Sequence, residues 1–377
     1  MSEIKSKKIL LVSSGFYPEI SPRSYRATEL AKELTRQGHS VVVISKYRNH
    51  DYSAFLKEND IKLKMWGKAR FPKVLVFKRK PFSIISRGLS RLLMVLFEYP
   101  GIEEMFRVKG SLRDESGYDL MISFAVPYPV HWGVARSRSE KHQIADIWIA
   151  DCGDPYMLNR LDRFRKPFYF KYAEKDFCRK CDFITLPVEG MQNKFYPEFM
   201  MKIRIIPQGI DFREVRLYNG AVYNEIPVII FAGSVIPGKR DLSSLLDYMS
   251  SLKVNFKFII YTSQVDWYGR YKQILGEKLE IRSYIDRLSL IYEMSKVSFL
   301  VNIDTVYDKG AMVEAVPSKL IDYALSGRPI LNLVSGSIDK DMVQEFLKGD
   351  YSRRRLVDKS SYDIRKVSLK FLDLIYQ

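Results

Sequence analysis

The sequence predicts an α/β protein with two doubly wound, Rossmann-like domains that face each other across a cleft. Three observations predict this fold class. Apolar runs of strand length alternate with helical stretches over residues 8–206, a turn-rich stretch follows at 207–227, and the alternation starts again at residue 228. Strands that alternate with helices form parallel sheets covered on both faces. Such domains bind ligands at the carboxyl ends of their strands, so we expect the site in the cleft.

The first domain opens with a β-α-β unit of ordinary length. Strands are predicted at 8–13 and 40–45, and a helix at about 23–37 ends at Gly38. No GxGxxG follows the first strand, so the dinucleotide-binding fingerprint is absent. The later elements of this domain are expected to be strands at 119–124, 143–150, 183–187 and 203–206 and helices at 130–137 and 168–179.

The second domain repeats the architecture without repeating the sequence. The terminal segment 362–376 places Ile364, Val367, Phe371 and Leu374 at helical spacing. We expect domains at 1–207 and 208–355, with 356–377 returning toward the first domain. The elements predicted for the second domain are strands at 228–232, 256–262, 279–281, 297–301 and 330–334 and helices at 241–252, 268–275, 287–294, 318–325 and 339–347.

The charge balance predicts an acidic partner. The 377 residues carry a formal net charge of +17, which suits nucleic acid, anionic lipid or a phosphorylated small molecule. The segment 61–97 contains ten Lys or Arg and no Asp or Glu, interleaved with aromatic residues such as Trp66 and Phe82. Basic residues alternating with bulky apolar ones are typical of a segment at an anionic membrane surface. A basic loop joined to a core helix remains the alternative.

Composition also favours the cytoplasm. No run approaches the ~18 apolar residues that span a bilayer, and Gly15 and Pro18 come too early for a secretory signal. The chain has three cysteines, of which Cys178 and Cys181 form a CxxC with no second pair. Buried thiols explain this pair better than a zinc or redox site.

The stretch 310–333 is the most informative part of the chain. Pro317 and Ser318 suit the first turn of a helix, and Glu314 and Asp322 flank that start, one in the approach loop and one on the helix. Free N–H groups at a helix start bind phosphate, and a carboxylate one turn further in accepts hydrogen bonds from a ribose. An ordinary capped helix between loop and strand is the alternative.

Several motifs in the same order resemble the retaining family 4 glycosyltransferases, also called group 1, which have the GT-B fold. The resemblance covers nearly the whole chain. The motifs are Ile9-Leu-Leu-Val-Ser-Ser-Gly-Phe-Tyr-Pro, Arg26 with Glu29-Leu-Ala-Lys-Glu-Leu, Gly38-His39-Ser-Val-Val-Val-Ile, Trp148-Ile-Ala-Asp-Cys-Gly-Asp-Pro, Ile206-Pro-Gln-Gly-Ile-Asp, Phe231-Ala-Gly-Ser before Lys239-Arg240, and Pro317-Ser-Lys-Leu-Ile-Asp-Tyr-Ala-Leu-Ser-Gly-Arg-Pro.

The resemblance implies the donor site. Glu314 matches the first glutamate of the family's pair and would contact the donor sugar, and Asp322 stands where the second glutamate would bind the ribose. Arg240 with Lys239 would neutralise the diphosphate, because positive groups aimed at developing negative charge lower the barrier. The expected donor-binding residues are Gly15, Gly233, Ser234, Ser318, Lys319, Leu320 and Asp322.

The first loop departs from the family, which often has two adjacent glycines where this chain has Ser21-Pro22-Arg23-Ser24. Arg23 or Arg26 would supply positive charge there instead. On the acceptor side we expect Arg26, the carboxylates Asp151 and Asp154, and His131. Turn-stabilising aspartates are the alternative for Asp151 and Asp154.

The expected activity is transfer of a hexose-type sugar, with retention, from a UDP- or GDP-linked donor to an acceptor hydroxyl. A lipid-linked saccharide in cell-surface polysaccharide synthesis, at the inner face of the plasma membrane, is the expected acceptor. No metal and no cofactor besides the nucleotide-sugar co-substrate are expected. A sugar-nucleotide epimerase of the same fold is the alternative. A nucleic-acid-binding protein is the third, although no recognition motif for nucleic acid is evident.

Overall fold

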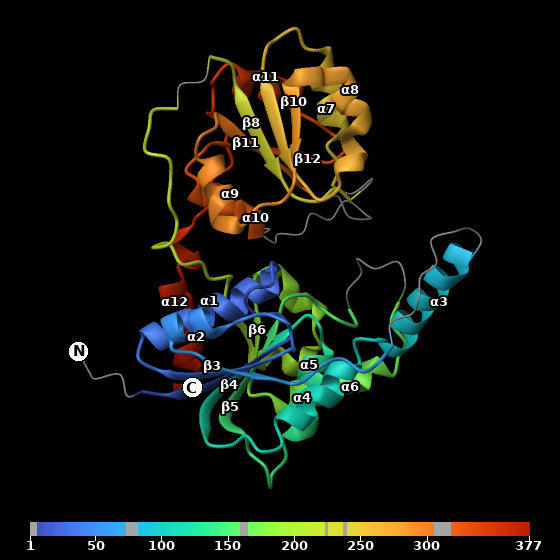
Figure 1. Cartoon of the computed structure of the whole chain (residues 1–377), viewed down its shortest axis with the longest axis vertical. Coiled ribbons are helices and arrows are strands. Elements are labelled where there is room, and N and C mark those ends of the chain that lie inside the picture. Colours follow the sequence, from blue (N-terminus) through green and yellow to red (C-terminus); the bar gives the residue numbers. More distant parts are fainter. Residues whose placement is uncertain (1–5, 73–81, 159–164, 223–224, 237–239, 305–317) are drawn as a thin grey trace. The chain divides into compact units, whose positions relative to one another are not determined.

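The computed structural model describes residues 6–72, 82–158, 165–222, 225–236, 240–304 and 318–377, without the side chains of Ser83 and Ser318 (Figure 1). The chain divides into two compact units, one formed by residues 1–210 with 363–377 and the other by residues 211–362. Each unit has its own parallel sheet. The prediction of two parallel-sheet α/β domains is therefore confirmed.

The sheet of the first unit has the order β3-β2-β1-β4-β5-β6-β7, and every neighbouring pair is parallel. Alternate side chains of a strand point to opposite faces. Leu10 and Val12 therefore enter one hydrophobic core, and Ile9 and Leu11 enter the other. The strands are β1 (Lys8–Ser13), β2 (Ser40–Ser45), β3 (Lys62–Met65), β4 (Tyr118–Ala125), β5 (Ala145–Cys152), β6 (Phe183–Leu186) and β7 (Ile203–Ile205).

Helices cover both faces of this sheet. One core is completed by α1 and α12, and the other by α4, α5 and α6. Cys178 and Cys181 are free and buried in the second of these cores, which confirms the buried-thiol interpretation. The helices of the unit are α1 (Pro22–Arg36), α2 (Ser53–Asn59), α3 (Phe82–Phe97), α4 (Glu103–Ser111), α5 (Pro129–Ser137), α6 (Phe170–Lys180) and α12 (Ile364–Leu372).

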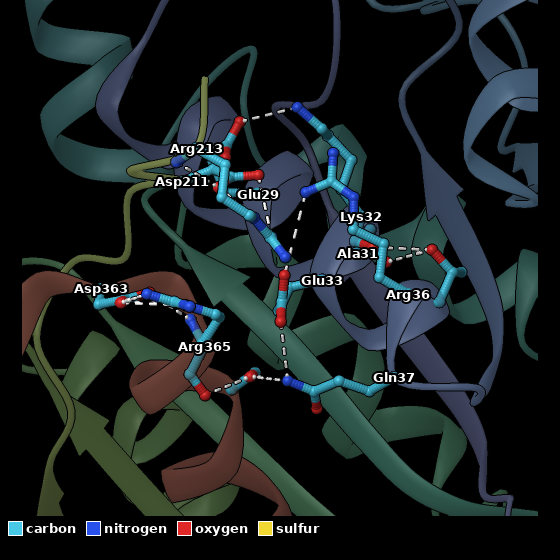
Figure 2. A network of polar contacts seen from close by, with 12 residues as sticks. Glu29, Ala31, Lys32, Glu33, Arg36, Gln37, Asp211, Arg213, Asp363 and Arg365 are labelled. Carbon is cyan, nitrogen blue, oxygen red and sulfur yellow. Dashed lines mark hydrogen bonds and ion pairs between the residues drawn. The ribbon is translucent and has the colours of Figure 1, made fainter. Parts of the chain in front are cut away.

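The C-terminal helix α12 packs on α1. Gln37 Nε2 donates hydrogen bonds to Glu33 Oε1 at 3.0 Å and to Ser368 Oγ at 2.7 Å, which joins the end of α1 to α12 (Figure 2). Asp363 caps α12 by accepting a hydrogen bond from the Arg365 amide at 3.0 Å. The chain therefore ends in the unit in which it began.

The second unit has the sheet order β10-β9-β8-β11-β12, again with parallel neighbours. Its strands are β8 (Val228–Ala232), β9 (Lys257–Tyr261), β10 (Leu279–Arg282), β11 (Phe299–Asp304) and β12 (Ile330–Val334). Its helices are α7 (Ser243–Ser251), α8 (Gly269–Leu275), α9 (Arg287–Met294), α10 (Ser318–Leu325) and α11 (Lys340–Leu347). Short 3₁₀ turns in the two units lie at Glu189–Lys194, Pro197–Lys202, Val265–Tyr268, Gly276–Lys278, Ser360–Tyr362 and Asp373–Tyr376.

The basic segment 61–97 divides into two different parts. Its beginning is the edge strand β3 followed by Trp66, whose side chain is buried in the core. Its end is the helix α3, which exposes several large apolar side chains. The expectation that Trp66 belongs to a membrane-facing segment is wrong, because Trp66 completes the sheet's core. Across the described stretches of the chain, no helix is long and apolar enough to cross a membrane.

Candidate functional site

The loop after β8 begins with a fixed turn. Gly233 has φ of +145°, which side chains with a Cβ rarely adopt, and its amide donates a hydrogen bond to the Tyr261 carbonyl at 3.0 Å. Gln264 then holds Val235 from both sides: its Oε1 accepts from the Val235 amide at 2.7 Å, and its Nε2 donates to the Val235 carbonyl at 3.2 Å. Ser234, which lies between these anchors, is partly exposed at the carboxyl end of the sheet.

Arg240 is held at the far end of the same loop. Ile236 and Arg240 exchange two backbone hydrogen bonds of 2.9 and 2.8 Å. Asp241 follows, and its carboxylate accepts from the Ser243 amide at 2.9 Å where α7 begins. The Nε of Arg240 is buried without a hydrogen-bond partner among the described residues. Lys239, the other member of the expected basic pair, lies outside the described residues.

Lys319 lies in the first turn of α10, beside the end of β8. The helix is anchored there because the Tyr323 hydroxyl accepts a hydrogen bond from the Ala232 amide at 2.8 Å. The Lys319 amine lies 4.8 Å from the centre of the Phe231 ring, and within the described part of the chain it has no hydrogen-bond partner. Burial and the positive charge of Arg240 lower the pKa of Lys319 to about 7, although Asp304 opposes this change.

Within the described part of the chain, Arg240 and Lys319 form a cationic site whose hydrogen-bonding capacity is not satisfied. A buried charge without a partner is costly, so proteins rarely keep one unless a ligand completes it. The helix beginning at Ser318 adds N–H groups that have no partner within the helix. An anion with several oxygens would accept hydrogen bonds from the Arg240 guanidinium, the Lys319 amine and the backbone N–H groups at the helix start. The Leu320 side chain is fully buried, so any contact it makes with a ligand must come from its backbone.

Asp322 lies one turn further along α10 and is paired with α9. Asp286 caps α9 by accepting from the Ser289 amide at 2.9 Å. The next residue, Arg287, donates to Asp322 Oδ1 from Nε at 2.8 Å and from Nη2 at 2.6 Å. Burial raises the pKa of Asp322 although Arg287 opposes it. Contact between Asp322 and a ribose stays a prediction, as does the role of Glu314, which lies outside the described residues.

A polar network at the ends of β11 and β12 was missed by the sequence reasoning. Asp304 accepts from Arg355 Nη1 at 2.9 Å, from Asn332 Nδ2 at 2.8 Å and from Asn302 Nδ2 at 2.8 Å. The available signal was the two asparagines inside otherwise apolar strands. Arg355 gave no local signal, because it comes from a loop that follows α11. Among the described residues, Asp304 is the negative group whose charge raises the pKa of Lys319.

The corresponding edge of the first sheet carries a closed ion cluster. Arg26 donates from Nε and Nη2 to the two oxygens of Asp151, each at 2.7 Å, and Thr185 donates to Asp151 Oδ1 at 2.7 Å. Arg26 also donates to the carbonyls of Pro207 at 2.6 Å and Ile206 at 2.9 Å. Both charged side chains are buried. Burial would raise the pKa of Asp151, but Arg26 and Arg23 outweigh it and hold the pKa below its ordinary value.

The other predicted residues of the first unit differ in exposure. His131 is fully buried, with Nδ1 2.8 Å from Ser123 Oγ, and burial lowers the pKa of this imidazole to about 3. Its ring is therefore neutral near pH 7 and belongs to the core. Gly15 packs against the start of α1, where an added Cβ would lie 3.3 Å from the Ser24 nitrogen. Asp154 alone among the four acceptor-side predictions is exposed.

Arg23 lies next to Asp154 at this edge. Its guanidinium donates to Asp151 at 3.0 Å and covers Gly153, where an added Cβ would lie 2.3 Å from Arg23 Cζ. The side chain keeps 18% of its surface exposed, in contrast to 2% for Arg26. Arg23 therefore presents part of a cation to solvent beside an exposed carboxylate.

No model of a known protein family matches the sequence, and no curated protein matches it. Solved structures do match. A glycosyltransferase from Rickettsia africae superposes with a TM-score of 0.58 at 13% identity, over 99% of this chain and 94% of that chain. Anabaena Alr3699/HepE in complex with UDP and glucose superposes with a TM-score of 0.59 at 10% identity, over 98% and 99%. The chain has the GT-B fold.

A third structure with this fold has a different activity. The UDP-GlcNAc 2-epimerase from Methanocaldococcus jannaschii superposes with a TM-score of 0.55 at 10% identity, over 98% of this chain and 99% of that chain. Since identities this low show the fold alone, the chemistry must be argued from the side chains of this protein.

Proposed function

We propose that the protein is a glycosyltransferase that moves a hexose-type sugar, with retention, from a UDP- or GDP-linked donor to an acceptor hydroxyl. The observation that carries this proposal is the Lys319 amine, enclosed beside Arg240 at the carboxyl end of the second sheet and without a hydrogen-bond partner among the described residues. A diphosphate would complete this site. The GT-B fold is consistent with it, and the Anabaena protein of this fold holds UDP and glucose.

The reaction breaks the bond between the anomeric carbon and the distal phosphate oxygen. The acceptor oxygen bonds to the anomeric carbon on the face from which the diphosphate departs, and the acceptor proton passes to the leaving diphosphate. Negative charge grows on the diphosphate, and Arg240, Lys239 and Lys319 offset it, which is why we expect no metal requirement. Glu314 is assigned to the donor sugar and Asp322 to the ribose.

A lipid-linked saccharide of cell-surface polysaccharide synthesis is the acceptor class we propose, with the protein peripheral at the inner face of the plasma membrane. The net charge of +17 and the acid-free segment 61–97 support this choice. The exposed Asp154 and the partly exposed Arg23, whose charge acts on Asp154, are the candidate acceptor contacts at the first sheet's edge.

A thermal-shift panel of nucleoside diphosphates and their sugars, followed by a transfer assay, tests the proposal. Arg240→Ala is expected to lose both nucleotide binding and transfer. Glu314→Ala is expected to keep nucleotide binding and lose transfer, because its role begins at the sugar. Normal transfer by Glu314→Ala would contradict the assignment.

A sugar-nucleotide epimerase is the second candidate, favoured by the epimerase among the matching structures. It would bind the same donor, so binding cannot separate the two functions. Incubating the protein with the stabilising donor and no acceptor does so. Conversion of the donor to a different sugar nucleotide supports the epimerase. A donor that stays unchanged in this incubation, and is consumed when an acceptor is added, supports the transferase.

A further inference from the structure

Helix α3 exposes an apolar face that the described residues of its unit leave uncovered. Ile85, Leu89 and Leu92 follow one another at helical spacing, and their exposed fractions are 65%, 49% and 53%. Ile84 and Phe97 add exposed fractions of 62% and 56%. In Figure 1, α3 projects from the helices that cover the sheet of its unit instead of lying on that sheet. A large exposed apolar patch of this kind marks an interaction site.

The patch continues onto the chain before and in the first turn of α6. The Tyr169 hydroxyl donates a hydrogen bond to the Leu96 carbonyl, which fixes the segment 168–172 against the end of α3. Phe168 and Tyr172 in that segment are 75% and 66% exposed, and Lys171 between them is also exposed. The apolar surface is therefore built from two stretches that are about 70 residues apart in sequence.

Charge decides between the occupants of this surface. The stretch 61–97 has no acidic residue, and Lys68, Arg70 and Arg87 are exposed. Protein interfaces are depleted in lysine, whereas an anionic bilayer attracts lysine and arginine beside apolar side chains. With 16 residues, α3 is about 24 Å long, too short to span a bilayer and long enough to lie along its surface.

We infer that α3 and the segment 168–172 together form a docking surface for an anionic lipid bilayer. Ile85, Leu89, Leu92 and Phe168 enter the boundary between headgroups and acyl chains, while the lysines and arginines contact lipid phosphates. The inference extends the proposed function by naming where the membrane binds, and it depends on that function only for its biological purpose.

Sedimentation of the full-length protein with vesicles tests the inference. Wild-type protein is expected to bind phosphatidylcholine vesicles containing phosphatidylglycerol at least tenfold more tightly than pure phosphatidylcholine vesicles. The double variant Leu89→Asp/Leu92→Asp and the single variant Phe168→Asp are expected to lose at least tenfold in affinity for the anionic vesicles. Met201→Asp is the matched control, since Met201 is 87% exposed in the same unit and lies outside the surface.

Two results would overturn the inference: wild-type protein that fails to bind anionic vesicles, or binding that survives in both Asp variants. A wild-type dimer that Leu89→Asp/Leu92→Asp dissociates, with no vesicle binding, would instead make this surface a contact between copies. Unchanged thermal unfolding and nucleotide binding in the variants show that the fold is intact. Vesicle binding without any nucleotide binding would refute the proposed function and leave this inference standing.

Discussion

The two sheets carry opposite kinds of charged cluster at their carboxyl ends. In the first unit, Asp151 is enclosed by Arg26, Arg23 and Thr185. Arg26 donates four hydrogen bonds, two to Asp151 and two to backbone carbonyls, which leave it buried and satisfied. In the second unit, Arg240 and Lys319 have buried nitrogens without a hydrogen-bond partner among the described residues, and the charge of Arg240 helps to lower the pKa of Lys319. A charged residue at a sheet's edge therefore indicates a ligand only when its partners are missing.

Removing Arg26 is expected to have the largest effect. Arg26→Ala leaves the buried Asp151 carboxylate without its main partner, which should lower the free energy of unfolding by about 3–5 kcal/mol. Denaturant unfolding measures this change. Arg36→Ala on the same helix is the control and should cost less than about 1 kcal/mol, because its pair with Glu33 at 3.9 Å is partly exposed. Equal losses of stability in the two variants would contradict a stabilising role for the cluster of Arg26 and Asp151.

Removing Lys319 is expected to affect binding instead of folding. Lys319→Met deletes one charged hydrogen bond to the diphosphate, so affinity for the preferred nucleoside diphosphate should fall about 10- to 100-fold. The melting temperature without ligand should stay level or rise, because an unpaired buried amine is removed. Lys340→Met, an exposed lysine of the same unit, is the control. A clear loss of stability with unchanged affinity would show that Lys319 is structural.

Lys319 should also make both the stability of the protein and its nucleotide affinity depend on pH. The pKa of Lys319 is about 7 in the ligand-free protein and 10.5 in the unfolded chain. The folded state therefore binds fewer protons in this window, and Lys319 makes stability rise with pH from 7 toward 10.5. A bound diphosphate favours the charged amine, so nucleotide affinity should fall by up to about tenfold per pH unit above pH 7.5. Titrations at several pH values should find no such fall in Lys319→Met.

The smallest expected effect concerns the ribose. Asp322 already accepts a hydrogen bond from Arg287, so a further hydrogen bond to a ribose hydroxyl should be no stronger than one between neutral groups. Asp322→Asn should weaken the preference for a ribonucleoside diphosphate over its 2′-deoxy analogue by about three- to tenfold. Competition binding with the two nucleotides measures the preference. An unchanged preference would place the ribose elsewhere.

The sequence predicted the regular elements well where local signals agree. The strands β1, β2, β8 and β12 occur at the predicted residues because they are short apolar runs bounded by turns. The elements β3, α2 and α4 were not predicted. They lie in or beside the basic segment, where lysines mask the apolar positions that the tertiary structure buries, such as Ile61 and Trp66.

The site was predicted only in outline. Sequence motifs pointed to Arg240, Lys319 and Asp322, and the structure brings Arg240 close enough to Lys319 to lower the pKa of its amine. Sequence reasoning did not find that Arg26 and Asp151 satisfy each other, because the pairing joins residues 125 positions apart. For α3, the sequence predicted apolar residues at a membrane surface but did not locate the exposed face, since periodicity shows which side is apolar and not whether anything covers it.

Calorimetric titration of nucleoside diphosphates into the full-length protein tests most directly whether Lys319 and Arg240 bind the diphosphate. We predict that UDP or GDP binds wild-type protein and that binding takes up protons near pH 8. Lys319→Met should abolish the proton uptake and weaken the binding. Titration in buffers of different ionisation enthalpy measures the uptake. Absence of binding by every nucleoside diphosphate, or equal binding by wild-type protein, Lys319→Met and Arg240→Ala, would contradict the account.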